Sequence, residues 1–211
     1  MEDRLLFVST EVSPQSHADV GTDHAKLPLY LLNNKLCQRV IAVEKSPSAY
    51  HVAKQALWGR EAEVRLGDGL RVLKANEVHS VSLCGMGGHL IQKILSQDPS
   101  KVPPIVIAQP NRDSHKVREW ALRSGFHLVR EQMATGFSVY EILTFHRACG
   151  PDKAYLDQPL ELALHFGPRL LAERHPLLLA ELKRKRKTLT DHPLHEEMRR
   201  VKLAINFLYS S

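Results

Sequence analysis

Short apolar runs alternate with amphipathic segments along the first two thirds of the chain. The runs that read as strands lie at residues 18–21, 39–44, 63–66, 80–84, 104–108, 127–132 and 139–145. The segments with helical spacing of apolar residues lie at residues 27–36, 48–58, 89–95 and 114–124. Strands that alternate with helices indicate βαβ units and a parallel sheet, and the last two strands look like an antiparallel pair. The pattern therefore predicts an α/β fold with a mostly parallel, seven-stranded sheet.

The pattern changes after residues 148–158, which contain glycine and prolines and show no periodicity. Beyond them it is wholly helical. One apolar seam with 4, 3, 4, 3 spacing runs through Leu194, Met198, Val201, Ile205 and Leu208, and a similar seam runs through Leu171, Leu178, Leu182 and Leu189. Asp191-His192-Pro193 interrupts the run, since proline suits the first turn of a new helix. We expect one domain over residues 1–150 and, over 151–211, two antiparallel helices joined near 190–193.

Composition narrows the class of protein. The hydrophobic fraction of 43% is too high for a disordered chain, and the apolar runs are far shorter than a membrane span needs. The acidic start of the chain does not resemble a secretory signal. The three cysteines form no CxxC pair, so we expect reduced thiols with neither a zinc site nor disulfides. These features favour a cytoplasmic protein that needs no metal and no membrane.

The basic charge of the chain is concentrated near its end. The net charge is +6, and residues 152–211 hold 11 basic and 8 acidic side chains in a short stretch. The densest basic run is Lys183, Arg184, Lys185, Arg186 and Lys187. Such a run is commonly a solvated helix face, but it can also contact the phosphates of a nucleic acid.

The loop after the first strand contains the first candidate for a binding site. Gly21 lets a ligand approach the main chain, but it stands alone, so the loop does not match the GxGxxG dinucleotide motif. Asp23 disfavours a bound phosphate and suits a ligand with cationic and hydroxyl groups. S-adenosylmethionine has an ammonium group, a sulfonium and a ribose. The alternative is an ordinary turn in which Thr22 or Asp23 caps the next helix.

Acidic residues also follow the second and third strands. Glu44 lies 23 residues after Gly21, the spacing at which Rossmann-type sites bind ribose hydroxyls. Asp68, between two glycines, could accept a hydrogen bond from an adenine amino group. The alternatives are a polar strand end and a tight Asp-Gly turn.

The fourth and fifth strands end in small and amide residues. Gly85-Met86-Gly87-Gly88 leaves room for a flat ring or a reactive methyl group, or else serves helix packing. Gln109-Pro110-Asn111 places two amides beside a proline and could hold a base edge, or else be a simple proline turn.

These segments together resemble the bacterial tRNA (adenine(22)-N(1))-methyltransferase family. The resemblance is carried by residues 18–28, 64–69, 85–88 and 109–111, by 118–120 and 140–142, and by 165–171, so it covers nearly the whole chain. It departs from the family at Lys26, Ser48-Ala49 and Cys84. It implies a Rossmann-like class I methyltransferase domain with a coiled-coil-like C-terminal helical domain. It also implies S-adenosyl-L-methionine as cofactor and methylation at N1 of an adenine in the tRNA D-loop.

On this reading the candidate residues fall into three groups. For the cofactor they are Gly21, Thr22, Asp23, His24, Pro28, Glu44, Lys45, Asp68, Gly69, Gly85, Met86 and Gly87. For the target base, including the acceptor of an N6 proton, they are Asp23, His24, Gln109 and Asn111. For tRNA phosphates they are residues 183–187. His24 could instead be a structural donor at the start of a helix.

Two other functions fit the same sequence. A methyltransferase for a small molecule or a protein would use the same cofactor site without a basic appendage. An RNA-binding protein on a degenerate Rossmann scaffold would need no cofactor, and the three acidic strand ends argue against it. We expect the protein to act as a monomer.

Overall fold

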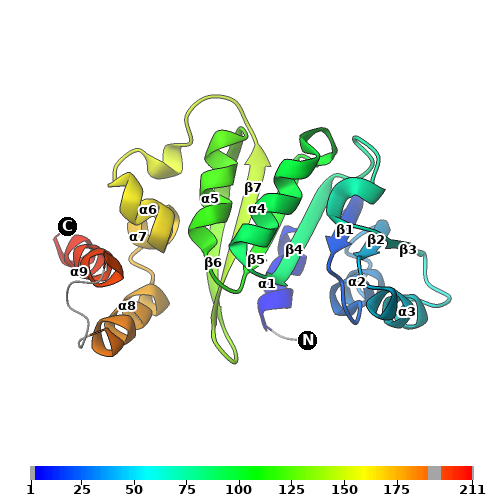
Figure 1. The fold of residues 1–211 in the computed structure, drawn as a ribbon, viewed down its shortest axis with the longest axis horizontal. Coiled ribbons are helices and arrows are strands. Elements are labelled where there is room, and N and C mark those ends of the chain that lie inside the picture. The colour runs from blue at the N-terminus through cyan, green and yellow to red at the C-terminus, as the bar shows by residue number, and fades with distance from the viewer. Residues whose placement is uncertain (1–2, 190–195, 211) are drawn as a thin grey trace.

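A computed structural model describes residues 3–189 and 196–210 of the chain. Its strands are β1 (Ser16–Val20), β2 (Arg39–Glu44), β3 (Ala62–Leu66), β4 (Ser80–Met86), β5 (Ile105–Pro110), β6 (Phe126–Thr135) and β7 (Val139–Arg147). They form one sheet in the order β3-β2-β1-β4-β5-β7-β6 (Figure 1). Pairing is parallel from β3 to β5, and β7 is antiparallel to both of its neighbours. The predicted seven-stranded, mostly parallel sheet is therefore confirmed.

Helices cover both faces of the sheet. They are α1 (Asp3–Glu11), α2 (Lys26–Asn33), α3 (Pro47–Ala56), α4 (Gly88–Gln97) and α5 (Ser114–Arg123). Because side chains alternate along a strand, Val40 in β2 packs with α1 and α2, whereas Ile41 packs on the opposite face with α4 and α5. The four predicted helices of this part are present, with ends shifted by at most three residues.

Helix α1 was not among the predicted elements. Its Leu5 and Val8 are buried and, with Val12, are spaced three and four residues apart, so the helical period was present in the sequence. Val8 and Val12 pack against α2, β5, β6 and β7. This packing brings the N-terminal segment to the carboxyl ends of the central strands.

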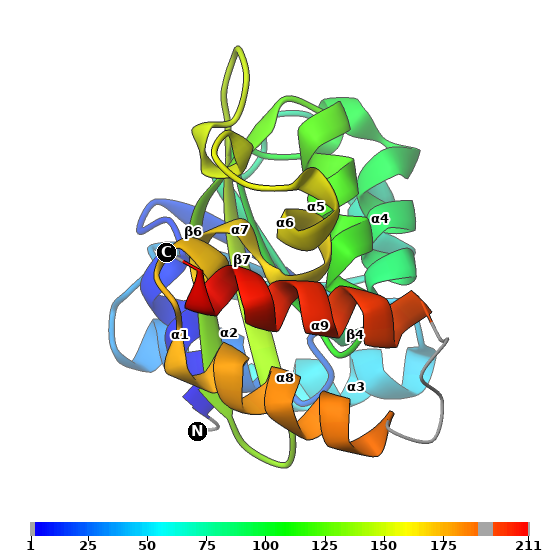
Figure 2. The same ribbon diagram turned by 90° about the vertical axis from the view of Figure 1, so that its left-hand side faces the viewer.

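In the part of the chain after β7 that the structure describes, the α-helices are α6 (Leu160–Phe166), α7 (Pro168–Ala172), α8 (Pro176–Thr188) and α9 (Glu196–Tyr209). Figure 2 shows α8 and α9 side by side and antiparallel, whereas the predicted joint near residues 190–193 lies outside the described residues. Met198, Val201, Ile205 and Leu208 are buried along α9 as expected. Leu194 and Asp191-His192-Pro193 lie outside the described residues.

The predicted seam through Leu171, Leu178, Leu182 and Leu189 is not on one helix. Leu171 belongs to α7, and α8 begins only at Pro176, so no single helix carries both Leu171 and Leu178. Proline has no N–H and its ring clashes with the preceding turn, so it starts a new helix rather than continuing one. Leu171 and Leu178 still share one apolar cluster, to which Met133 of β6 also belongs. The helical appendage is thereby packed onto the edge of the sheet.

Candidate functional site

The loop between β1 and α2 has an unusual backbone. Gly21, Asp23 and Ala25 all have positive φ angles, of 77°, 51° and 54°. Residues other than glycine adopt this conformation only at a cost of about 1–3 kcal/mol, and such strain gathers at ligand sites. Ala25 is the residue that caps α2, and no side chain makes a capping hydrogen bond there. The alternative reading of Thr22 or Asp23 as a helix cap was therefore wrong.

This loop lines a cavity of about 360 Å³ at the carboxyl ends of β1 and β4. Open parallel sheets bind ligands at this edge. The cavity brings together five of the predicted cofactor residues: Gly21, Thr22, Asp23, His24 and Gly85. Arg4 and Leu5 of α1, together with Asp19 of β1, also line it. The side chains of Asp23 and His24 are 74% and 61% exposed, with Oδ2 of Asp23 3.6 Å from Nε2 of His24.

Asp19 sits at the end of a buried chain of hydrogen bonds. Its Oδ1 accepts a hydrogen bond of 2.5 Å from the Ser82 hydroxyl, and the same hydroxyl oxygen lies 2.8 Å from Nε2 of His17. Since Ser82 donates its only proton to Asp19, His17 must carry its own proton on Nε2. Nδ1 of His17 is then free to accept from the Ser80 hydroxyl at 2.8 Å. This network fixes the side chain of Asp19 at the wall of the cavity.

Burial sets the charge of the groups in this network. It lowers the pKa of His17 to about 3, so this histidine is neutral at physiological pH. Burial also raises the pKa of Asp19, while hydrogen bonds from Ser82 and Thr22 act in the opposite direction. Burial and the charge of Asp19 raise the pKa of the neighbouring Cys84 thiol, which therefore stays protonated.

The acidic residues predicted after β2 and β3 lie beside this cavity. Glu44 is only 7% exposed and accepts a hydrogen bond from the backbone N–H of Asp23. Lys45 and Asp68 form an ion pair of 3.2 Å. Because β1, β2 and β3 are parallel, the loops that follow these three strands lie side by side at one edge of the sheet. Pro28 is buried in the first turn of α2 and is not part of the cavity wall.

The turn after β5 forms the wall between this cavity and the next. The Gln109 side chain is fully buried, and its oxygen accepts hydrogen bonds from Arg4 and from the Gly85 N–H. Asn111 donates from its side chain to the Gly85 carbonyl at 2.7 Å and from its backbone to the Met86 carbonyl at 2.9 Å. Gln109 therefore braces the turn, while the exposed Asn111 faces outward.

The glycines after β4 have different roles. A Cβ at Gly88 would lie 2.0 Å from the backbone oxygen of Asp113, so this position must be small for α4 to pack. A Cβ at Gly87 would meet only the Arg112 side chain, at 3.4 Å, and one at Gly85 would lie 3.6 Å from Arg4. The packing alternative is thus correct for Gly88, and Gly85 is the glycine that opens the cavity. Met86 fills space beside Gly21, where a Cβ would lie 2.8 Å from its Cε.

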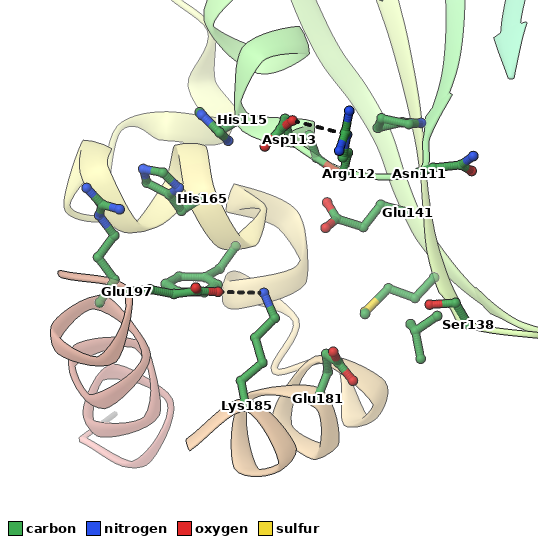
Figure 3. Close-up of a pocket in the computed structure, with 16 residues that line it drawn as sticks. Asn111, Arg112, Asp113, His115, Ser138, Glu141, His165, Glu181, Lys185 and Glu197 are labelled. Atoms are coloured by element: carbon green, nitrogen blue, oxygen red, sulfur yellow. Dashed lines mark hydrogen bonds and ion pairs between the residues drawn. The ribbon is translucent and has the colours of Figure 1, made fainter. Parts of the chain in front are cut away.

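A larger cavity of about 480 Å³ lies on the other side of Asn111. Figure 3 shows this groove between the β5–α5 turn and helices α6, α8 and α9. Its walls carry His115, stacked on His165 with ring centroids 4.5 Å apart, and Glu141 of β7. The two cavities are linked by one hydrogen bond, because Asn111 lines the groove and donates to the carbonyl of Gly85, which lines the first cavity.

The predicted basic run lies on α8 but does not form one face. Lys185 turns into the groove and pairs with Glu197 at 3.2 Å, while Arg184 pairs with Glu181 at 2.6 Å. Lys183 lies over the ring of Tyr209. Five consecutive residues spread around more than one helical turn. The run therefore presents cations in several directions.

Sequence reasoning missed three residues of the site. Asp19 and His17 belong to β1, whose five residues are all buried. Polar side chains within a strand of this kind were the only sign of them in the sequence. Arg4 belongs to the helix that was not expected. Within residues 3–189 and 196–210, no group of three or more histidine, cysteine or acidic side chains could hold a metal ion. In the same part of the chain, no helix is long and apolar enough to cross a membrane.

The residues around the first cavity fit a cationic, hydroxyl-bearing cofactor. Asp19 and Asp23 face the cavity, and Glu44 and Asp68 end the two neighbouring strands. Gly21 and Gly85 leave space that a Cβ would narrow. Arg4 and Lys26 line the same cavity, and its carboxylates suit the ammonium and the ribose hydroxyls of such a cofactor.

Comparisons with known proteins agree with this fit. The family model of tRNA (adenine(22)-N(1))-methyltransferase, TrmK, matches residues 17–204. A tRNA (adenine(22)-N(1))-methyltransferase of Bacillus subtilis strain 168 is 32% identical over 169 residues, which are 77% of this chain and 71% of that protein.

Solved structures agree over the full length. The B. subtilis m1A22 tRNA methyltransferase TrmK has a TM-score of 0.85 and 26% identity, covering 100% of this chain and 97% of that one. A Streptococcus pneumoniae protein in complex with S-adenosyl-L-methionine has the same score and identity, covering 100% and 98%. The fold, the cavity at the strand ends and these matches lead to one conclusion: the chain belongs to the tRNA (adenine(22)-N(1))-methyltransferase family.

Proposed function

We propose that this protein transfers a methyl group from S-adenosyl-L-methionine to N1 of adenine 22 in the D-loop of tRNA. The observation that carries the proposal is the cavity with Asp19 and Asp23 at the carboxyl ends of β1 and β4, in a chain that matches this family over residues 17–204. A methyltransferase for a small molecule would not need the groove beside this cavity or the helical appendage that closes it.

The cofactor supplies an electrophilic methyl group on a sulfonium. Three carboxylates would bind the cofactor. Asp19 would pair with its ammonium group, Glu44 would accept hydrogen bonds from its ribose hydroxyls, and Asp68 would accept one from its adenine amino group. His17 and Ser82 keep Asp19 in place. The protein thereby contributes position and electrostatics rather than covalent chemistry.

The target base must be held with N1 toward the methyl group. Neutral adenine has a lone pair on N1, so no base has to activate it and no metal is needed. Asn111 lines the groove with an exposed side chain that donates to the Gly85 carbonyl and accepts from the Gln109 amide, so these bonds would hold it in place beside the incoming base. Gln109 is buried beneath it and supports the same turn. His24 and Asp23 lie at the mouth of the cofactor cavity and would shield it from water.

The appendage is the proposed contact for the body of the tRNA. Residues 151–211 form a unit next to the methyltransferase domain of residues 1–150, and the cations of 183–187 would meet phosphates. One chain carries both the cavity and the groove, so we propose a monomer as the working unit. Its substrate is found in the cytoplasm, where we propose that it acts.

The direct test is methylation of unmodified tRNA with labelled cofactor, followed by nucleoside analysis. We expect 1-methyladenosine at position 22, and none in a transcript with guanosine at that position. Size-exclusion chromatography with light scattering of the enzyme–tRNA mixture would report the working stoichiometry. Binding of tRNA without any methyl transfer would instead favour an RNA-binding protein on the same scaffold.

A further inference from the structure

The groove beside the cofactor cavity contains a carboxylate that the proposed function does not yet use. Glu141 belongs to β7, which pairs with β5 as far as Leu143 opposite Ala108. Continued along both strands, this register places Glu141 beside the Gln109-Pro110-Asn111 turn. Figure 3 shows its carboxylate directed into the groove, near Asn111 and Arg112. The side chain is 25% exposed, so a ligand in the groove can reach it.

One oxygen of Glu141 is held from behind. Its Oε2 accepts a hydrogen bond from Arg118, a guanidinium that is fully buried. Arg118 also pairs with Glu131 at 2.7 Å, and Glu131 is fully buried as well. None of the described residues donates a hydrogen bond to Oε1 of Glu141. The carboxylate is thus fixed in direction and keeps one oxygen for a partner in the groove.

The charges of the groove suit a base better than a phosphate. Its lining carries three cations and four carboxylates: Arg112, Lys185, Arg200, Asp113, Glu141, Glu181 and Glu197. Lys185 and Arg200 are paired with Glu197 and Glu161 at 3.2 and 2.8 Å. Behind the wall, the single charge of Arg118 faces two carboxylates. A group that gains positive charge is therefore favoured here, and an anion is not.

We propose that this groove receives the target adenine and that Glu141 accepts a hydrogen bond from its N6 amino group. The proposal rests on the proposed function and names the residue that stabilises the reacting base. In the reaction the N1 lone pair forms the bond to the methyl carbon. The carbon–sulfur bond breaks and its electron pair stays on sulfur, so the positive charge passes to adenine, where N1 and N6 share it. No proton has to leave in this step, and the carboxylate offsets the charge as it develops.

This assignment gives the acidic role at the target base to Glu141 rather than to Asp23, which was a candidate for the acceptor of an N6 proton. Asp23 lies on the far side of the cofactor cavity, is 74% exposed and does not line the groove. Water screens a charge in such a position, whereas Glu141 is partly buried and held in direction. Asp23 keeps its place in the cofactor group.

The test is the single-turnover rate of Glu141→Gln at saturating cofactor and tRNA. With adenosine at position 22, we expect the rate to fall roughly 10–100-fold, with cofactor and tRNA affinities within about twofold of wild type. A second tRNA carries purine riboside at position 22 and has no amino group. We expect the wild-type enzyme to be slower on this tRNA, and Glu141→Gln to cause no further loss.

Two control variants separate catalysis from structure. Glu131→Gln disturbs the same buried Arg118 without touching the groove, and Glu173→Gln removes an exposed carboxylate at the end of α7, outside the groove. Both should keep their rates within about threefold of wild type. If Glu141→Gln does not fold, Glu141→Asp retains the charge and retracts the carboxylate. It should lose less rate on adenosine and again none on purine riboside.

Three results would overturn the inference: a wild-type rate in folded Glu141→Gln, an equal loss in Glu131→Gln, or an equal loss on both tRNAs. A failure of the proposed function is distinguishable, since the wild-type enzyme would then leave adenine 22 unmethylated before any variant is compared.

Discussion

At the scale of single residues, the site depends on carboxylates whose burial costs free energy of folding. Asp19 is 5% exposed in a strand whose five residues are all buried. Removing a carboxylate from water without compensation costs several kcal/mol, and hydrogen bonds recover only part of this cost. The protein keeps Asp19 at the cavity wall with a dedicated donor, Ser82. A side chain maintained in this way is better explained by a ligand than by stability.

The acidic strand ends lead to the first prediction. Glu44→Ala and Asp68→Ala should each weaken S-adenosyl-L-methionine binding by about 0.5–1.5 kcal/mol, a factor of roughly 2–10, because each removes one hydrogen bond to the ligand. Glu61→Ala is the matched control, since Glu61 is exposed at the start of β3, the opposite end from the cavity. Calorimetry on folded variants measures the effect. Equal affinities in all three variants would show that the cofactor lies elsewhere.

His17 leads to a prediction about pH. Its pKa is about 3 in the folded chain and 6.5 in the unfolded chain, so only the unfolded chain binds a proton between these values. Stability from this group is complete above pH 6.5 and falls as the pH drops toward 3, with a slope approaching about 1.4 kcal/mol per pH unit. Urea unfolding of wild type and His17→Gln from pH 7.5 to 4.5 isolates the effect. Parallel curves for the two proteins would contradict it.

At the scale of elements, helix α8 combines two roles on one short segment. Its buried residues Leu178 and Leu182 pack against α9, and its cations point in several directions. Lys183 and Lys187 are exposed, whereas Lys185 is partly buried in the groove. The exposed Lys183 and Lys187 can therefore follow a phosphate backbone without breaking the hairpin.

The matching prediction concerns salt. Lys183→Ser combined with Lys187→Ser should weaken tRNA binding and flatten its salt dependence, because each lost phosphate contact removes roughly 0.9 from the log–log slope on a duplex. The control is Lys35→Ser combined with Lys74→Ser, which removes the same charge from exposed positions outside the basic run. Fluorescence anisotropy at several salt concentrations gives both slopes. Identical slopes for the two double variants would identify the run as a solvated face.

At the scale of the whole molecule, one buried side chain connects the sheet to the appendage. Arg118 of α5 pairs with Glu131 of β6 and donates to the Leu164 carbonyl of α6 at 2.8 Å. Glu131 in turn accepts hydrogen bonds from the backbone N–H groups of Arg169 and Leu170 at the start of α7. A buried network of this kind leaves few alternative positions for the appendage.

Breaking this network should destabilise the whole protein. Arg118→Met leaves two carboxylates without their partner and should lower the free energy of unfolding by about 3–5 kcal/mol. Lys116→Met, on the same helix, breaks only the partly exposed pair with Glu119 and should cost less than about 1 kcal/mol. Urea unfolding compares the two variants. Equal losses would mean that Arg118 contributes no more than a surface ion pair.

Much of this architecture could be predicted from the sequence. The alternation of strands and helices, the acidic residues after β1, β2 and β3, and the apolar seam of α9 are local patterns with a known period or spacing. The same patterns placed Gly21, Asp23 and Glu44 at one edge, because parallel strands end on the same side. The family motifs at residues 118–120 and 140–142 could also be identified in the sequence. The contact between them could not be predicted from it.

Tertiary structure alone decided the remainder. Arg118 and Glu141 are 23 residues apart in the chain, and Arg4 and Gln109 are 105 apart, so no local spacing brings them together. Helices α7 and α8 are separate because α8 begins at Pro176, whereas the spacing of the leucines predicted one continuous helix. The groove exists only because α8 and α9 fold back beside β5 and β7. A sequence specifies local pattern directly, whereas such pairs arise from the packing of many segments at once, and the site lies where they meet.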